Sequence, residues 1–274
     1  MNRRVWTRQP QVAVGVDWSN PITRGLIELH SGATGLWDAS GNGRNLTKVS
    51  VPTIVAGSHG LGFKAATSAY FKTPDLTVPI GATNEVTLLM LMIGGTTSDQ
   101  GLGRFGSAPS DNMDHYPGGG TIYSAAFSVS RWLNNIATQV PFGTPHVLTI
   151  RAKSNIREFR QNGLLTTGAS AVSAPTLPPG GTLWIGSSII TGSTWFYSGH
   201  SPIIAIWNRY LSNTEESILS RSLTAPWQLF TPLSRPVFAP SAAATSIYTL
   251  SNATYQQGSI TAYGVVPQVD VTVT

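Results

Sequence analysis

The segment Val86-Thr-Leu-Leu-Met-Leu-Met-Ile93 decides the fold class of this chain. It is apolar at every position except the threonine, and its length is that of a single strand. A run of this kind is typical of a β-strand that is covered on both faces. We therefore expect a central strand here. The run is also the longest apolar one in the chain and far too short to cross a bilayer, so no membrane insertion is expected.

Short apolar segments separated by turn residues lie on both sides of this strand. They are Leu26–Leu29, Thr53–Val55, Ala69–Lys72, Thr121–Val129, Val147–Arg151, Arg157–Gln161, Thr182–Gly186 and Ile203–Trp207. The chain contains 28 Gly and 18 Pro, which supply turns between strands. Asn42-Gly43 and Asn162-Gly163 are typical hairpin-turn dipeptides. This rhythm predicts a mostly β, antiparallel sandwich.

One short helix is predicted near the end of this pattern. Ser212-Asn-Thr-Glu215 has the form of a capping box, in which Ser and Glu each satisfy a free backbone amide. Ile218, Leu219 and Leu223 then give the helix one apolar face, and Ala225-Pro226 should end it. We expect this helix at the edge of the sandwich.

The termini divide the chain into three parts. Residues 1–20 are expected to form an N-terminal arm, residues 21–240 the sandwich, and residues 241–274 a linker and a C-terminal β tail. Val269, Val271 and Val273 alternate in that tail and are candidate assembly residues. Because so short a β segment is marginal alone, it should pair with the body, with another copy, or with a different protein by strand addition.

Composition narrows the classes of partner. Charged residues make up only 11% of the chain, which predicts that partners cover much of the surface. The net charge of +5 comes mainly from scattered Arg, so no nucleic-acid partner is expected. Without Cys there is no disulfide and no thiolate metal site. The first twenty residues lack an apolar signal-peptide core, so synthesis in a cytoplasm without a signal peptide is expected.

The densest polar cluster is Asp111-Asn-Met-Asp114-His115, between Pro109 and Pro117-Gly-Gly-Gly120. Its residues favour a solvated loop, although oxygen ligands with one imidazole also suit calcium at Asp111 and Asp114. The candidate ligand-binding residues, placed in or near this loop, are Asp111, Asp114, His115, Tyr116 and Trp132. The other calcium candidate is Asp38, although its turn-rich loop favours a structural role. No other cofactor is expected.

Catalysis is not expected from the sequence. Glycosidases of β-sandwich type need two carboxylates beside the scissile bond, typically in an E-x-D-x-x-E run. The glutamates are Glu28, Glu85, Glu158, Glu215 and Glu216, and none lies in such a run. Trp184, Trp195 and Trp207 lie in strand-like segments, where aromatic side chains usually fill the core.

Several segments, in order, resemble the concanavalin A-like lectin/glucanase superfamily in its laminin G-like form, common in bacteriophage structural proteins. They are Asn20-Pro-Ile-Thr-Arg-Gly-Leu26, Leu36-Trp-Asp-Ala-Ser-Gly-Asn-Gly-Arg-Asn-Leu46, Gly62-Phe63, Ala69-Tyr-Phe71, Phe142-Gly-Thr-Pro-His146, Phe159-Arg-Gln-Asn-Gly163, Leu183-Trp-Ile-Gly186, Phe196-Tyr-Ser-Gly199, Ile206-Trp-Asn-Arg-Tyr-Leu-Ser212 and Pro226-Trp-Gln-Leu-Phe230. Two departures stand out: Thr144-Pro145 replaces the Trp that usually precedes His146, and Arg160 stands where the family has Tyr.

The resemblance covers about residues 20–232 and implies a concanavalin A-like jelly roll. It also implies a non-enzymatic phage virion protein of the tail, baseplate, fibre or capsid-decoration type. The expected partners are then other virion proteins and copies of this chain, and the expected location is the virion. Two alternatives stay open: a carbohydrate-binding adhesion module that contacts host-surface glycan, and a glycan hydrolase.

Overall fold

The computed structural model describes most of the chain. The described residues are 7–10, 14–66, 69–81, 83, 85–94, 100–105, 112–116, 121–124, 132–135, 143–153, 156–166, 182–190, 193–233, 247–250, 253–257 and 269–272. The chain divides into two compact units, Met1–Leu233 and Ser234–Thr274. Among these residues, none of the helices has the length and apolar character that a membrane span requires.

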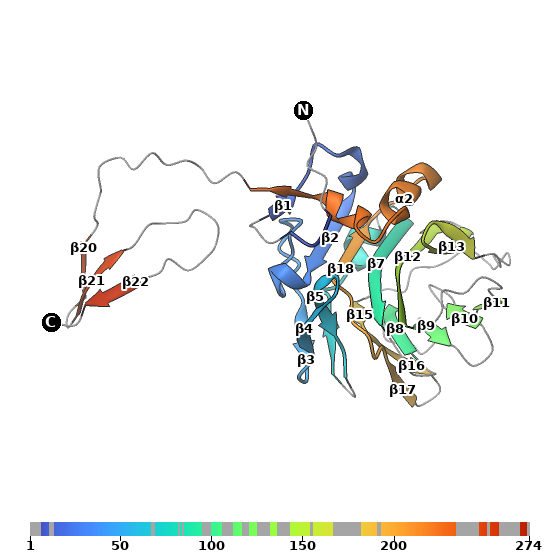
Figure 1. Ribbon diagram of the computed structural model, residues 1–274, viewed down its shortest axis with the longest axis horizontal. Helices are drawn as coiled ribbons and strands as arrows, with labels where there is room; N and C mark the ends of the chain where they lie inside the picture. The colour runs from blue at the N-terminus through green and yellow to red at the C-terminus, as the bar shows by residue number, and fades with distance from the viewer. Residues whose placement is uncertain are drawn as a thin grey trace. The chain divides into compact units, whose positions relative to one another are not determined.

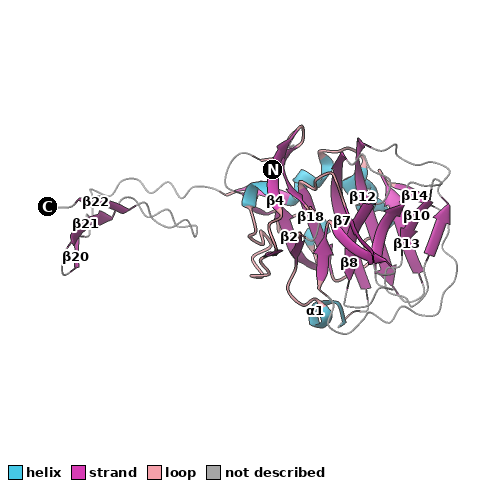
Figure 2. Cartoon of the chain, turned by 90° about the horizontal axis from the view of Figure 1, so that it is seen from below, coloured by secondary structure: helices cyan, strands magenta, loops and turns pink. Residues whose placement is uncertain are grey.

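The first unit is built on a six-stranded antiparallel sheet. Its strands, in spatial order, are β14 (Leu164–Thr166), β13 (Ile156–Gln161), β12 (Gly143–Lys153), β7 (Glu85–Gly94), β18 (Ile203–Trp207) and β2 (Leu26–Ser31). The central strands lie side by side in both ribbon views (Figure 1, Figure 2). The sequence prediction of a central strand at residues 86–93 is confirmed, since β7 pairs with β12 on one side and β18 on the other.

A second antiparallel sheet of seven strands faces the first. Its spatial order is β11 (Trp132–Asn135), β10 (Thr121–Ser124), β9 (Asn112–Tyr116), β8 (Gln100–Phe105), β15 (Leu183–Ile185), β6 (Tyr70–Lys72) and β3 (Thr47–Val49). Three two-stranded pairs complete the unit: β1 (Val14–Val16) with β19 (Phe230–Pro232), β4 (Thr53–Gly57) with β5 (Gly60–Lys64), and β16 (Ser187–Ile190) with β17 (Ser193–Phe196).

Two hydrophobic clusters cover opposite faces of β7. Leu88, Met90 and Met92 belong to the cluster between the two sheets, together with Phe71 and Ile185 of the seven-stranded sheet. The intervening residues belong to a second cluster on the outer face of the six-stranded sheet, which includes Leu89, Leu91, Ile93, Trp207 and Trp227. The alternation of a strand sends successive side chains to opposite faces, so an unbroken apolar run fits a strand buried on both sides.

Short helices form the layer over that outer face. They are α2 (Asn213–Ser220), η1 (Pro21–Thr23) and η4 (Ala225–Leu229), while η2 (Gly32–Thr34) and α1 (Thr77–Gly81) lie elsewhere in the unit. Figure 1 shows α2 beside the central strands. The capping box at Ser212 and Glu215 is confirmed. The expected ending is wrong: α2 stops at Ser220, and Pro226 opens the separate turn η4, whose Trp227 packs on the sheet.

The described residues also correct other local expectations. Asn162-Gly163 forms the predicted tight turn between β13 and β14, with φ of 49° and 80°. Asn42-Gly43 does not join a hairpin, because the next strand, β3, pairs with β6 instead. Within the expected N-terminal arm, residues 14–16 pair with the body of the unit, since Val16 is buried and β1 pairs with β19.

The second unit contains three strands in antiparallel succession. They are β20 (Ile247–Leu250), β21 (Ala253–Gln257) and β22 (Val269–Thr272), in that spatial order. Val269 lies opposite Gln257 and Val271 opposite Tyr255. The strand predicted at the C-terminus is therefore confirmed for Val269 and Val271, and its partner is β21 within the same tail. Val273 lies outside the described residues.

Candidate functional site

An aromatic pair lies on the outer face of the seven-stranded sheet. Leu183 and Ile185 of β15 are buried in the core between the sheets, so the alternation of the strand places Trp184 on the opposite face. The same rule applies to β6, where Phe71 is buried and Tyr70 is half-buried on the outer side. The rings of Tyr70 and Trp184 are stacked, with centroids 4.3 Å apart and planes inclined by 17°.

Polar and aliphatic groups border this pair. Lys72 follows Tyr70 by two residues on β6 and lies directly opposite Trp184 in the register of β15. On the neighbouring strand β3, Val49 lies opposite Tyr70 and Thr47 lies opposite Lys72. Among the described residues, Lys72 makes no salt bridge. We call these five residues the Tyr70–Trp184 face; it combines two stacked aromatic rings with an ammonium group and the hydroxyl groups of Thr47 and Tyr70.

The ligand residues predicted from the sequence lie farther along the same sheet. The expectation of a loop is wrong for Asp114, His115 and Tyr116, because they belong to strand β9, which pairs with β8 and β10. Trp132 likewise belongs to a strand, β11. Pairing on both sides of β9 outweighs the low strand propensity of Asn and Asp. Asp111 lies outside the described residues, as do the side chains of the other four.

Asp38 holds a tight polar loop together. Its Oδ1 accepts hydrogen bonds from the backbone amides of Leu29 (3.0 Å) and Ser40 (2.9 Å). Its Oδ2 accepts from the Ser40 hydroxyl (2.7 Å) and the Arg44 amide (3.1 Å). Both carboxylate oxygens thus face hydrogen-bond donors, and the carboxylate is buried. This arrangement supports the structural interpretation of Asp38, since a cation would have to displace those donors.

No metal-ligand cluster is found in the portion of the chain that the structure describes. Within it, no three side chains of His, Asp or Glu come close enough together to hold a metal ion. The calcium candidate at Asp111 and Asp114 falls outside that search, so it stays a prediction.

Each of the five glutamates has a structural contact. Glu85 accepts a hydrogen bond from the Tyr210 amide at 3.0 Å. Glu215 forms a two-point contact with Arg209, at 2.7 and 2.9 Å, and these hydrogen bonds lower the pKa of Glu215 to about 2. Glu28 is fully buried, and its Oε2 lies 3.0 Å from Nε2 of His30. Burial raises the pKa of Glu28. The remaining two lie beside arginines: Glu158 is on β13, and Glu216 is on the buried side of α2 itself.

Those arginines attach α2 to the six-stranded sheet. The buried Arg151 pairs with Glu158 and donates to Asn213 Oδ1 at 2.7 Å. Arg160 donates to the same Oδ1 at 3.2 Å, and its guanidinium lies 3.7 Å from the buried carboxylate of Glu216. This network gives a physical reason for Arg160 where the resembled family has Tyr: here the position supplies a cation to the buried carboxylate of Glu216 and the half-buried carboxylate of Glu158.

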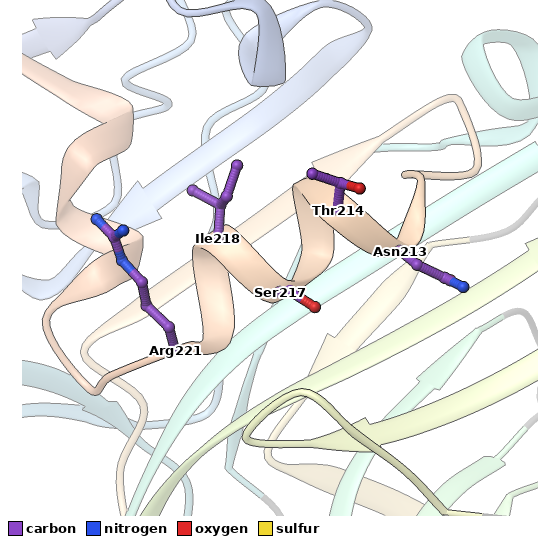
Figure 3. Close-up of a pocket in the computed structure, with 5 residues that line it drawn as sticks. All are labelled: Asn213, Thr214, Ser217, Ile218 and Arg221. Atoms are coloured by element: carbon purple, nitrogen blue, oxygen red, sulfur yellow. The ribbon is translucent and has the colours of Figure 1, made fainter.

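A shallow depression lies on the exposed side of the same helix. Its volume is about 370 Å³, and Figure 3 shows its lining residues along α2 and just past the end of that helix. They are Asn213, Thr214, Ser217, Ile218 and Arg221. The lining has one charged residue, and Asn213 Oδ1 is already engaged by two arginines, so we do not assign a ligand to it.

The sequence interpretation missed the aromatic pair. Trp207 is fully buried, as predicted, and its indole N–H donates to the Ile22 carbonyl at 2.8 Å. Trp184 differs, because it lies on the outer face. The all-apolar triplet Leu183-Trp-Ile185 does not reveal which side faces the core. The alternation of Tyr70, Phe71 and Lys72 on the paired strand was the available signal.

Comparisons with known proteins add information on the fold. No protein-family model and no curated protein sequence match the chain. Among solved structures, domain 4 of AbnA, an extracellular arabinanase from Geobacillus stearothermophilus in complex with arabinotriose, is 13% identical with a TM-score of 0.54. The match covers 72% of this chain and 98% of that domain.

Two further structures are similar over part of their length. A Trypanosoma rangeli sialidase variant with trans-sialidase activity is 13% identical, with a TM-score of 0.58, over 76% of this chain and 34% of the sialidase. Botulinum neurotoxin type C, whose cell entry depends on two ganglioside molecules, is 10% identical, with a TM-score of 0.54, over 74% of this chain and 52% of the toxin chain. The chain thus spans about a third and about half of these proteins. At such identities, the likeness defines a class of fold, the antiparallel β-sandwich.

Proposed function

We propose that the first unit is a non-catalytic carbohydrate-binding module with a concanavalin A-like jelly-roll topology, and that the Tyr70–Trp184 face contacts the sugar. The observation that carries the proposal is the stacked, half-buried aromatic pair on the outer side of a sheet. Sugar rings present flat C–H surfaces, and Trp and Tyr offer a matching apolar face at low entropic cost. The Lys72 ammonium supplies a hydrogen-bond donor at the rim of that surface, and the Thr47 hydroxyl, which itself donates to the Lys72 carbonyl at 3.3 Å, supplies an acceptor.

The comparisons support this proposal through the architecture. The arabinanase domain, which the chain matches over almost its whole length, was solved with arabinotriose bound, and the toxin is described with gangliosides. A sandwich of this class can therefore serve as a glycan-binding module. Host-surface glycan is the ligand class that the adhesion alternative implies.

The contacts of the glutamates support a non-catalytic role. A glycosidase needs one carboxyl group to donate a proton and a second one free to attack or to activate water. In this protein the glutamates instead bind backbone amides, arginines or a buried histidine. We therefore favour binding over the hydrolase alternative.

A binding assay with matched tryptophan variants tests the proposal. Trp184→Ala removes half of the stacked pair and should weaken binding in a panel of immobilised oligosaccharides, arabinotriose included, by about tenfold, or 1.4 kcal/mol. Trp37→Ala is the control, because Trp37 is 66% exposed on a loop of the same unit. If Trp184→Ala binds as well as the wild type, or if the wild type binds no member of the panel, the proposal fails.

The sequence resemblance favours a second candidate, a structural protein of a phage virion in the tail, baseplate, fibre or capsid decoration. The separate unit at the C-terminus supports it, because a module displayed on a particle needs a part that attaches it to other subunits. Mass spectrometry of density-purified particles, from a lysate of cells that express this chain, tests this candidate. The chain should be present at a fixed ratio to the major capsid protein; its absence from particles contradicts the candidate.

A further inference from the structure

The C-terminal unit Ser234–Thr274 is too small for a hydrophobic core alone to stabilise it. Its described strands β20, β21 and β22 form one three-stranded antiparallel sheet, with Tyr248 opposite Tyr255 and Val271 opposite Tyr255 on the other side. The unit has about 40 residues, and a chain of that size cannot bury enough apolar surface to offset its conformational entropy. Proteins in this size range are stabilised by disulfides, by a structural metal or by association.

The sequence excludes a disulfide and a structural metal as the source of stability for this unit. The whole chain contains no Cys, so no disulfide forms. The unit contains no His, and its single carboxylate side chain is that of Asp270, so it lacks the ligands that a structural metal site needs. Association with another polypeptide surface remains.

The charges and the strand edges of the unit indicate which polypeptide surface it associates with. Arg235 and Asp270 are the only charged residues of the unit. The unit therefore lacks the charges that would complement a strongly charged partner, and two copies of it would repel each other little. Edge strands of monomeric proteins normally carry Lys or Pro, which block pairing with another chain. β20 contains neither a charge nor a Pro, and β22 contains only Asp270.

The pairing inside the unit leaves two edges available. β21 occupies one side of β20 and one side of β22, and among the described residues neither outer strand has a second partner. We propose that the C-terminal unit associates with the same unit of other copies of this chain, and that β20 and β22 pair across the contact. Each added strand pair satisfies main-chain groups that a monomer leaves to water. The inference does not depend on carbohydrate binding by the first unit.

Light scattering coupled to gel filtration tests the proposal on full-length protein. The monomer mass is 29.1 kDa, and the expected mass is at least twice that value. A truncation that ends at Leu233 keeps both hydrophobic clusters, which lie within Val16–Phe230, and should run as a monomer. It should also keep its oligosaccharide binding.

A pair of charge variants in the full chain completes the design. Val269→Lys with Val271→Lys places two like charges on β22 and should at least halve the mass. The control, Ala242→Lys with Ala244→Lys, adds the same charge outside the described strands and should leave the mass unchanged.

Three outcomes would overturn the inference. A monomeric full-length protein shows that the tail docks on its own sandwich, recruits a different protein or does not fold. A truncation that stays oligomeric shows that the contact lies in the first unit. Equal masses for the β22 variant and the wild type show that this strand takes no part. If Trp184→Ala binds oligosaccharide as well as the wild type while the full-length protein keeps at least twice the monomer mass, the carbohydrate proposal fails and this inference stands, so the two proposals fail separately.

Discussion

Replacing Asp38 should destabilise the sandwich by several kilocalories per mole. In Asp38→Ala, the backbone amides of Leu29 and Ser40 lose their acceptor, and both residues are buried. A buried donor without a partner costs about 1–3 kcal/mol, so we expect a loss of about 4 kcal/mol. For a domain of this size, about 2–4 °C of melting temperature is lost per kcal/mol, so the midpoint should fall by roughly 8–16 °C. Arg44 contributes less, because its amide lies in a half-exposed residue that water can reach.

Asp38→Asn is the matched variant. Its side-chain oxygen can still accept from the amides of Leu29 and Ser40. Its NH2 group then faces the Arg44 amide, another donor, whereas the Ser40 hydroxyl can turn to donate to the Ile27 carbonyl and accept from that NH2 group. We expect a loss of about 1 kcal/mol, measured by urea unfolding. If Asn is as damaging as Ala, or if Ala costs less than about 1 kcal/mol, the hydrogen-bond reasoning is wrong. Addition of EDTA to the wild type should not move the midpoint; a drop that is seen in the wild type and absent from Asp38→Asn would mean that Asp38 binds a cation.

Three further substitutions test other contacts. Arg209 lowers the pKa of Glu215 to about 2, against 4.5 normally, so their pair stabilises the protein above pH 4.5, and this contribution is lost as the pH falls through 2. Glu215→Gln should cost about 2 kcal/mol at pH 7 after allowance for solvent screening, and less at pH 3; equal losses at both pH values would contradict this. Trp207→Phe removes the buried bond to the Ile22 carbonyl and should cost about 2 kcal/mol in urea unfolding, whereas Trp37→Phe should cost almost nothing. Gly163→Ala and Gly41→Ala both strain a residue at φ near 80°, but only the first places a Cβ 2.9 Å from Ser220 Oγ. The excess loss at Gly163, about 1 kcal/mol in calorimetry, would measure that contact, and equal losses would exclude it.

The sandwich was predictable from the sequence because a strand that is buried on both faces is apolar at consecutive positions. Val86–Ile93 is apolar at nearly every position, and the structure places its alternate side chains in two different cores. The capping box at Ser212 and the turn at Asn162-Gly163 were predictable for a similar reason. In each, a local hydrogen bond or backbone angle restricts the residue types.

The candidate site was not predictable in the same way. Whether Trp184 faces the core depends on its pairing with β6 and β8, which are distant in sequence. Asp114 and His115 were expected in a loop because Asn, Asp, Gly and Pro are frequent around them, and neighbouring strands overrode that preference. Two partners of Arg160, Asn213 and Glu216, come from a helix more than fifty residues away.

The pairing of β1 with β19 has a consequence for how the protein is made. Val14 lies opposite Pro232, so the first strand of the unit waits for nearly its last residue to leave the ribosome. At about 5–20 residues per second, that wait lasts roughly 10–45 seconds. During this time Val16 lacks the last members of the outer cluster, Trp227, Leu229 and Phe230. The pairing of β1 with β19 is therefore among the last steps in forming the unit, after the central strands β7, β12 and β18 have been made.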